Sequence, residues 1–137
     1  MTYNYADAWH PILKQFVSVD ISKLHQLTKG RKPVYIKLAE IWGGNKDSPD
    51  FSEERLRKAD VRYPILLDTY TEGVGFKGGL VDGRHRKIKL MRAGKTHAPV
   101  IFLTTNDINV SRIKTNEVCI TLNKQLIINI FKALKSR

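Results

Sequence analysis

The sequence predicts an α+β domain in which helices pack on a small mixed sheet. Apolar and polar residues alternate along residues 34–38, as in a strand with one buried face, and residues 98–103 are apolar at nearly every position, as in a central strand. Other stretches repeat apolar residues at helical spacing behind a capping residue. Because no repeat or low-complexity linker divides the 137 residues, we expect one domain over residues 1–137.

Residues 1–33 are expected to form an N-terminal helical arm. Apolar residues lie at roughly helical spacing in residues 6–17, and Pro11 fits the first turn of such a helix. Val17 and Val19 also fit a short strand, so both alternatives remain open there. Asp20 can cap a second helix, which ends at Gly30. The apolar face of this second helix consists of Ile21, Leu24 and Leu27.

The core is expected at about residues 34–104. Strands are predicted at residues 34–38, 63–67, 80–81 and 98–103, and helices at residues 52–60 and 84–92. The first of these helices starts at Ser52, a capping residue followed by acidic residues in the first turn. A glycine-rich loop at residues 73–79 joins two of the strands, which therefore resemble a hairpin with a loose turn. A C-terminal extension is expected over residues 105–137, with a strand at residues 118–122 and a helix capped by Asn123.

The chain is strongly basic, which bears on its partners. It contains 24 Lys and Arg against 13 Asp and Glu, so its formal net charge is +11 and its pI is about 9.9. Such an excess creates a positive field that favours phosphate-rich partners, nucleic acid first (DNA ahead of RNA) and anionic membrane surfaces second. The alternative is a basic surface that is simply solvated.

Cysteine and apolar content exclude several classes of protein. Cys119 is the only cysteine, which excludes an intrachain disulfide and a cysteine zinc site and fits a reducing compartment. The four histidines lack metal-ligand spacing, so no metal site is predicted. We expect a cytoplasmic protein with no membrane partner, because the sequence has neither a signal-like start nor an apolar run that could span a bilayer. The oligomeric state is left open.

The chemistry is expected to centre on the 82–86 turn, the segment Asp82-Gly83-Arg84-His85-Arg86 between a short strand and a helix. Gly83 allows a tight turn, and the start of the helix offers unpaired N–H groups and the positive end of its dipole. The side chains of Arg84, His85 and Arg86 add hydrogen-bond donors. These features predict an anion site suited to phosphate. Asp82, as a helix cap or an active carboxylate, and His85, as a general acid or base, are the candidate catalytic residues.

The arrangement of these segments resembles the ParB/sulfiredoxin-like fold over about residues 34–104. Members of that family have a strand opening with a Pro-Ile pair, an Asp-Gly-x-His-Arg type of turn, a helix ending in glycine and a Pro-Val strand. The corresponding residues here are Pro64-Ile65, the 82–86 turn, Gly94 and Pro99-Val100. The turn is most similar to that of the ParB-like kinases and ParB-like nucleases. It differs from sulfiredoxins, whose reactive cysteine is replaced by Arg84, and from partitioning ParB proteins, which tend to have an acidic residue there followed by two arginines.

This resemblance implies a binding site for nucleotide phosphates. Gly83, His85 and Arg86 occupy the positions that contact phosphate in the family, and Arg84 lies between them. The implied ligand is a nucleoside di- or triphosphate, with Mg²⁺ as a possible companion. In kinase-type members an acidic residue after the first strand acts in catalysis, and Glu40 is the candidate at that place.

A basic run follows the turn, and it is predicted to contact the backbone of nucleic acid. The alternative is a solvated helix face. Its members are Arg84, Lys87, Lys89, Arg92 and Lys95. The sequence thus predicts a ParB-like protein that binds nucleic acid and a phosphate or nucleotide at the 82–86 turn, with a DNA nuclease as one form of this function. The alternatives are a nucleotide-dependent small-molecule kinase or ATPase, and a binding module without catalysis.

Overall fold

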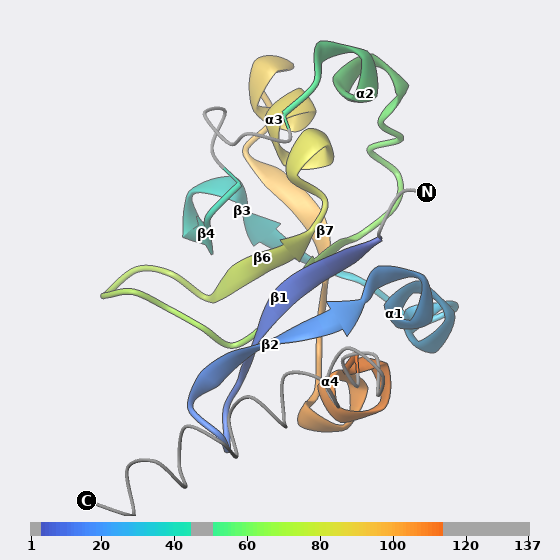
Figure 1. Ribbon diagram of the computed structural model, residues 1–137. Helices are drawn as coiled ribbons and strands as arrows, with labels where there is room; N and C mark the ends of the chain where they lie inside the picture. The colour runs from blue at the N-terminus through green and yellow to red at the C-terminus, as the bar shows by residue number, and fades with distance from the viewer. Residues whose placement is uncertain (1–3, 45–50, 114–137) are drawn as a thin grey trace, which may run out of the picture.

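A computed structural model describes residues 4–44 and 51–113 of the chain. In this part, a five-stranded mixed sheet has helices on it and a two-stranded hairpin packed beside it (Figure 1). The predicted fold class, α+β with a small mixed sheet, is therefore confirmed. None of the helices in the described ranges has the length and apolar character needed to cross a membrane.

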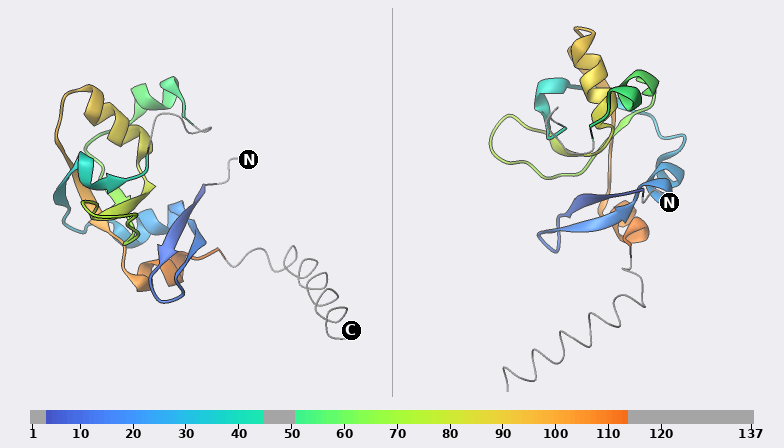
Figure 2. Two further views of the ribbon diagram at one scale, coloured as in Figure 1. Left: turned by 90° about the vertical axis from the view of Figure 1, so that its left-hand side faces the viewer. Right: turned by 45° about the horizontal axis from the view of Figure 1, so that its top comes forward.

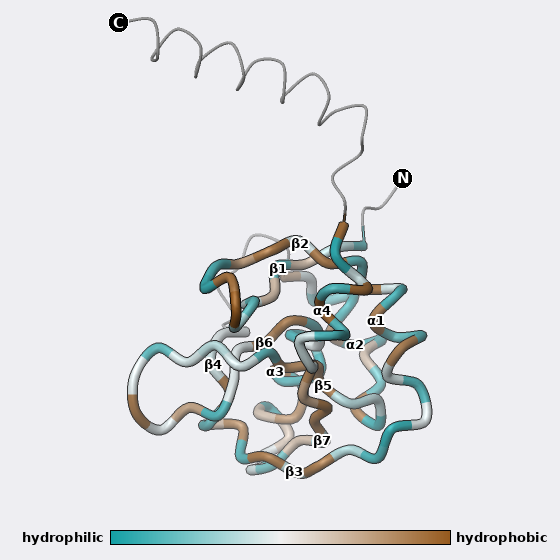
Figure 3. Tube along the Cα trace, turned by 90° about the horizontal axis from the view of Figure 1, so that it is seen from below, coloured by the Kyte–Doolittle hydropathy of each residue, from teal (hydrophilic) through white to brown (hydrophobic). Residues whose placement is uncertain are grey.

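The five-stranded sheet has the strand order β3-β7-β5-β6-β4. Its strands are β3 (Val34–Lys37), β4 (Ile41–Trp42), β5 (Ile65–Leu67), β6 (Gly78–Asp82) and β7 (His97–Phe102). β7 runs antiparallel to β3 and parallel to β5, and β6 runs antiparallel to β5 and parallel to β4. The expected pairing of β5 with β6 and the central position of β7 are both confirmed. Figure 3 shows hydrophobic residues along β5 and β7, in the middle of the sheet.

The N-terminal residues form a hairpin, so the helix expected over residues 6–17 is wrong. β1 (Tyr5–His10) pairs antiparallel with β2 (Gln15–Asp20). The buried side chains alternate along both strands, with Ala8, Val17 and Val19 facing the core. The apparent helical spacing came from apolar residues at and beside the turn, which are exposed: Ile12, Leu13 and Phe16.

One face of the sheet packs against the hairpin and two helices. α1 (Ile21–Thr28) begins at Asp20, whose carboxylate accepts a hydrogen bond from the Lys23 N–H, as the sequence predicts. α4 (Thr105–Ser111) begins at a capping box between Thr104 and Asp107. The sequence left this polar stretch without an assignment. The buried side chains of this layer include Leu24, Leu66, Ile101 and Ile108.

The opposite face of the sheet packs against α3 (Arg84–Arg92), the helix predicted over the same residues. The 3-10 helix η1 (Leu38–Glu40) and β4 complete this layer. Its core includes Leu38, Ile41, Ile65, Leu67, Leu90 and Val100. A short helix, α2 (Glu53–Lys58), capped by Ser52 as predicted, lies against the outer side of α3 (Figure 2). The strand and helix predicted at residues 118–122 and after Asn123 lie outside the described residues.

Candidate functional site

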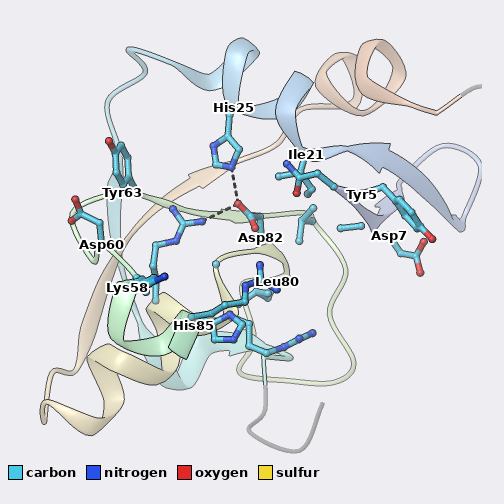
Figure 4. Close-up of a pocket in the computed structure, with 18 of the residues that line it drawn as sticks. Tyr5, Asp7, Ile21, His25, Lys58, Asp60, Tyr63, Leu80, Asp82 and His85 are labelled. Atoms are coloured by element: carbon cyan, nitrogen blue, oxygen red, sulfur yellow. Dashed lines mark hydrogen bonds and ion pairs between the residues drawn. The ribbon is translucent and has the colours of Figure 1, made fainter. Parts of the chain in front are cut away.

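A pocket of about 1010 Å³ opens where β6 ends and α3 begins. We call it the α3 pocket. All five residues of the 82–86 turn line it, together with side chains from β1, α1 and α2 (Figure 4). The other polar or aromatic side chains at its wall include Tyr5, Asp7, Phe16, His25, Trp42, Arg55, Lys58, Asp60 and Tyr63. The structure thus brings the predicted turn together with residues distant in sequence.

Gly83 gives the turn its shape. Its φ of 113° lies in the left-handed region, where any residue that has a Cβ atom is strained. A Cβ atom at this position would also lie 3.0 Å from Ile65 Cγ1. Gly83 is the N-cap of α3 and supplies no side-chain cap, and the first helical hydrogen bond runs from the Lys87 N–H to the Gly83 carbonyl at 2.9 Å. The first turn of α3, a helix of nine residues, therefore lies at the pocket wall without a side-chain cap from Gly83.

Asp82 and Arg86 brace the turn. The same carboxylate oxygen of Asp82 lies 2.8 Å from His25 Nε2 and 2.9 Å from an Arg86 guanidinium nitrogen. Arg86 also donates to the Pro64 carbonyl at 2.9 Å, and only 12% of its side chain is exposed. The Asp82 carboxylate at the end of β6 thus joins α1 to α3, and its contact with His25 is drawn in Figure 4. Arg86 also reaches the residue before β5. The structure gives Arg86 a bracing role; its contact with phosphate stays a prediction.

His85 holds α2 against α3. Its Nε2 accepts a hydrogen bond from the Ser52 N–H at 3.1 Å, and its ring stacks on Phe51 with centroids 5.6 Å apart and planes 13° apart. Because Nε2 accepts in this bond, it carries no proton while the bond is formed. Ser52 is the N-cap of α2, so this contact positions the helix that carries Arg55 and Lys58 to the pocket.

Cations outnumber carboxylates at the pocket wall. Arg55, Lys58, Arg84 and Arg86 line it, together with three aspartates. Asp82 is bound by Arg86 as described above. Asp60 is bound by Arg62, whose hydrogen bonds lower the pKa of the Asp60 carboxyl to about 2. Asp7 accepts a hydrogen bond from the Ser18 hydroxyl at 3.4 Å.

The basic run predicted to bind nucleic acid does not form one solvated face. Lys87 is buried, and its ammonium donates to the carbonyls of Ile41 and Gly43. Burial lowers the pKa of this ammonium. The structure gives Lys87 a structural role at the end of β4, and contact between Lys87 and nucleic acid stays a prediction. Lys95 is exposed, as expected.

Lys89 and Arg92 join α3 to α2. The Lys89 ammonium donates to the carbonyls of Arg57 and Ala59, at 2.9 and 2.8 Å. The Arg92 guanidinium lies 3.1 Å from a Glu53 carboxylate oxygen and sits over the ring of Phe51. These contacts give both side chains a structural role on the side of α3 that packs against α2, and nucleic-acid contact by them stays a prediction.

Glu40, the third catalytic candidate, does not line the α3 pocket. It ends η1, and its carboxylate lies 3.7 Å from the Lys77 ammonium. The Lys77 N–H also donates to the Glu40 carbonyl, at 2.8 Å, which fixes the glycine-rich loop before β6 to η1. The structure therefore brings His85 and Asp82 to the same pocket but not Glu40.

Several important residues were missed from the sequence. His25, Arg55 and Lys58 reach the α3 pocket from helices whose positions depend on long-range packing. Asp68, which is 2% exposed, accepts hydrogen bonds from the N–H groups of Trp9, Tyr70 and Gly79. Burial raises the pKa of the Asp68 carboxyl, although the three hydrogen bonds oppose that shift. No sequence pattern marks Asp68 as buried.

Aromatic side chains gather at one end of the pocket. The ring of Tyr70 lies 4.9 to 5.0 Å from those of Trp9, Phe16 and Trp42. Phe16 and Trp42 also line the pocket. Among the described residues, no group of three or more His, Cys, Asp or Glu side chains is placed to hold a metal ion.

A comparison with solved structures shows a similarity to a known protein. The chain is similar to the crystal structure of the C-terminally truncated chromosome-partitioning protein ParB from Caulobacter crescentus complexed with CTP-gamma-S. The match has 21% sequence identity and a TM-score of 0.41, and it covers 72% of this chain and 64% of that chain. No protein-family model and no curated protein matches the sequence. ParB is one of the two families in the predicted resemblance; the resemblance to sulfiredoxins stays a prediction.

Proposed function

We propose that the α3 pocket binds the phosphate groups of a nucleotide. The observation that carries this proposal is the start of α3, where Gly83 leaves the helix without a side-chain cap beside a cavity of about 1010 Å³. The N–H groups of the first helical turn and the positive end of the helix dipole favour an anion at this place. Arg55, Lys58 and Arg84 line the same cavity and add positive charge.

The aromatic wall favours a nucleoside phosphate over a free phosphate ion. Tyr5, Phe16, Trp42 and Tyr63 line the pocket together with the 82–86 turn. A base that stacks on such a ring gains about 1–3 kcal/mol. The cavity is also at the upper end of the range for small-molecule sites, which hold about 300–1,000 Å³. A nucleoside di- or triphosphate therefore matches both the polar and the apolar parts of the pocket.

Nucleic acid is the second candidate source of phosphate, because the net charge of +11 favours polyanions in general. The side chains of the predicted basic run support it less, since Lys87 is buried and Lys89 and Arg92 bind α2. The two candidates differ in their dependence on salt: duplex binding should weaken steeply as salt rises.

The contacts in the pocket favour binding over catalysis. A DNA nuclease, a kinase or an ATPase would need an active carboxylate or histidine at the phosphate. Asp82 already accepts from Arg86 and lies against His25, and His85 Nε2 accepts from Ser52. Magnesium would enter, if at all, with the phosphates of the ligand. Binding without catalysis is therefore the form of the proposal that we test.

The test is calorimetric titration of the wild-type protein with nucleoside triphosphates, tripolyphosphate and a short DNA duplex, each with and without Mg²⁺. The variant Arg55→Ala/Lys58→Ala removes two cations that line the pocket. The control Lys23→Ala/Lys29→Ala removes two exposed cations of α1 and its C-cap that do not line it. Both variants lose the same charge, so a general effect of charge should be equal in them.

We expect a triphosphate to bind the wild-type protein and the control, and to bind the pocket variant roughly tenfold more weakly, a difference of about 1.4 kcal/mol. Equal weakening in the pocket variant and the control would contradict a site at α3. Binding of the duplex alone, with steep salt dependence, would replace the nucleotide by nucleic acid as the ligand.

A further inference from the structure

A second cavity, of about 710 Å³, is lined by later residues of α3 than the α3 pocket. It opens between the end of β3, η1, the middle of α3 and the start of β7. We call it the lysine pocket, because three of the residues that line it are Lys37, Lys87 and Lys95. Lys87 and Met91 face it from α3, whereas residues 84–86 of the same helix line the α3 pocket. The two cavities thus share a helix but none of its residues.

The polar part of the lysine pocket carries positive charge alone. Its lining residues, all in the described part of the chain, include the three lysines and His97 but no Asp or Glu. Lys37 and Lys95 are exposed, and neither forms a salt bridge with another described residue. The carboxylate of Glu40, the last residue of η1, lies 3.7 Å from the Lys77 ammonium instead.

Lys87, which is buried, adds to the excess of positive charge at the lysine pocket. The Lys87 ammonium has two backbone carbonyls as acceptors and no carboxylate partner in the described residues. Burial without an opposite charge lowers its pKa. An anion in the adjacent cavity would oppose that shift, because a nearby opposite charge favours the ionised form.

The remaining wall of the lysine pocket is apolar. Leu38 and Ile41 are buried at its base, and Ala39 and Met91 stand at its sides. More than half of the Met91 side chain is exposed (56%), although it is a large apolar residue. Methionine is flexible and polarisable, and it adapts well to varied apolar ligands. A positively charged rim beside an apolar wall suits a molecule that combines one anionic group with a hydrocarbon chain.

We propose that the lysine pocket binds a carboxylate that carries an apolar chain, such as a medium-chain fatty acid. Lys37 and Lys95 hold the carboxylate at the rim, and the chain lies along Leu38, Ile41 and Met91. A singly charged group fits better than a phosphate, because this pocket lies toward the C-terminal half of α3, where the helix dipole is negative. It also contains no arginine, the residue that binds phosphate in two-point geometry.

Methionine NMR tests this proposal directly. The chain has two methionines, Met1 and Met91, so ¹³C-methyl labelling of methionine gives two signals, and Met91→Leu assigns them. Decanoate is titrated into the full-length wild-type protein, with decanol and acetate as probes that keep only the chain or only the carboxylate. The variant Lys37→Ala/Lys95→Ala removes the rim, and Lys23→Ala/Lys29→Ala is the control of equal charge, since neither of its residues lines the pocket.

We expect decanoate to shift the Met91 methyl signal saturably, and the rim variant to weaken this binding roughly tenfold while the control leaves it unchanged. Decanol and acetate should bind far more weakly than decanoate. Equal binding of decanol would reduce the site to an apolar patch, and equal binding of acetate would reduce it to a simple ion site; either result overturns the proposal. A Met91 signal that decanoate does not shift would overturn it as well.

Discussion

Asp68 and Asp82 stand at opposite ends of the paired strands β5 and β6, and both connect these strands to the N-terminal residues. Within residues 4–44 and 51–113, Asp68 accepts hydrogen bonds from backbone N–H groups alone, one of them from Trp9 in β1. Asp82 is bound instead by two side chains, Arg86 and His25. The first carboxylate is buried and the second is about a quarter exposed, at 2% and 26%.

This difference separates a structural connection from one that can rearrange. The partners of Asp68 belong to fixed backbone and have no alternative acceptor once they are buried, so the contact must persist in the folded state. The partners of Asp82 are side chains at a pocket wall, where a change of rotamer is enough to break the contact without moving the backbone. We therefore expect changes at Asp68 to reduce stability strongly and changes at Asp82 and its partner His25 to reduce it only slightly.

The largest effect is expected from Asp68→Ala. This change leaves the N–H groups of Trp9, Tyr70 and Gly79 without their acceptor, and it should lower the free energy of unfolding by about 3 kcal/mol. Urea unfolding measures it. Asp82→Ala is the matched change and should cost about 1 kcal/mol, because its carboxylate is partly solvated. Equal losses in the two variants would remove the distinction between the two carboxylates.

Gly83→Ala should affect both stability and binding. The left-handed backbone and the contact with Ile65 predict a loss of about 1–2 kcal/mol in the free energy of unfolding. The start of α3 should shift as well, so triphosphate binding should weaken by more than tenfold. Gly73→Ala is the control: it also has a positive φ, 103°, but an added Cβ would meet no atom within 4 Å. Normal binding by Gly83→Ala would show that the shape of this turn does not matter for the ligand.

The pH dependence of stability should distinguish Asp68 from an ordinary carboxylate. Because its pKa is raised in the folded protein, the folded state binds the proton more tightly than the unfolded chain does. The contribution of Asp68 is therefore greatest below the unfolded pKa of about 3.8 and decreases as the pH rises through the folded value. The stability of the wild type relative to Asp68→Asn should fall over this interval. A relative stability that rises with pH would contradict the assigned direction.

The smallest effect on stability is expected from His25→Ala. Its side chain is 46% exposed and its contact with Asp82 lies at a solvated pocket wall, so the loss should stay below about 1 kcal/mol. Asp82 would keep Arg86 as its partner, and triphosphate affinity should change less than threefold. Thermal unfolding and calorimetry measure the two quantities. A loss as large as that of Asp68→Ala would show that the contact of His25 is structural.

The sequence predicts the elements whose signals are local. The cap at Ser52, the helix of residues 84–92 and the strand at residues 98–103 each follow from their own residues, and each is present. The N-terminal hairpin could not be predicted in this way. Its register depends on packing against the sheet, and the exposed apolar residues at its turn imitate a helical period: Ile12 and Leu13.

The candidate site is also predictable from the sequence only where its residues are contiguous. The 82–86 turn is contiguous, so its glycine, its charges and the helix that follows are visible in the sequence. The rest of the wall comes from segments distant in sequence, and only the fold brings Arg55, Lys58 and His25 there. Burial is also a property of the fold: Lys87 looks like a member of a solvated basic run until the structure places its ammonium on the carbonyls of Ile41 and Gly43.

The most direct measurement of the central claim is an amide NMR titration of the ¹⁵N-labelled protein with inorganic pyrophosphate. If phosphate binds at the start of α3, the largest shifts should occur at the amides of Gly83, Arg84, His85 and Arg86, with smaller ones near Arg55 and Lys58. Amides at the end of α3 and around Asp68 should remain unchanged. Shifts spread over the basic surface, with the amides of residues 83–86 unaffected, would contradict a phosphate site at the 82–86 turn.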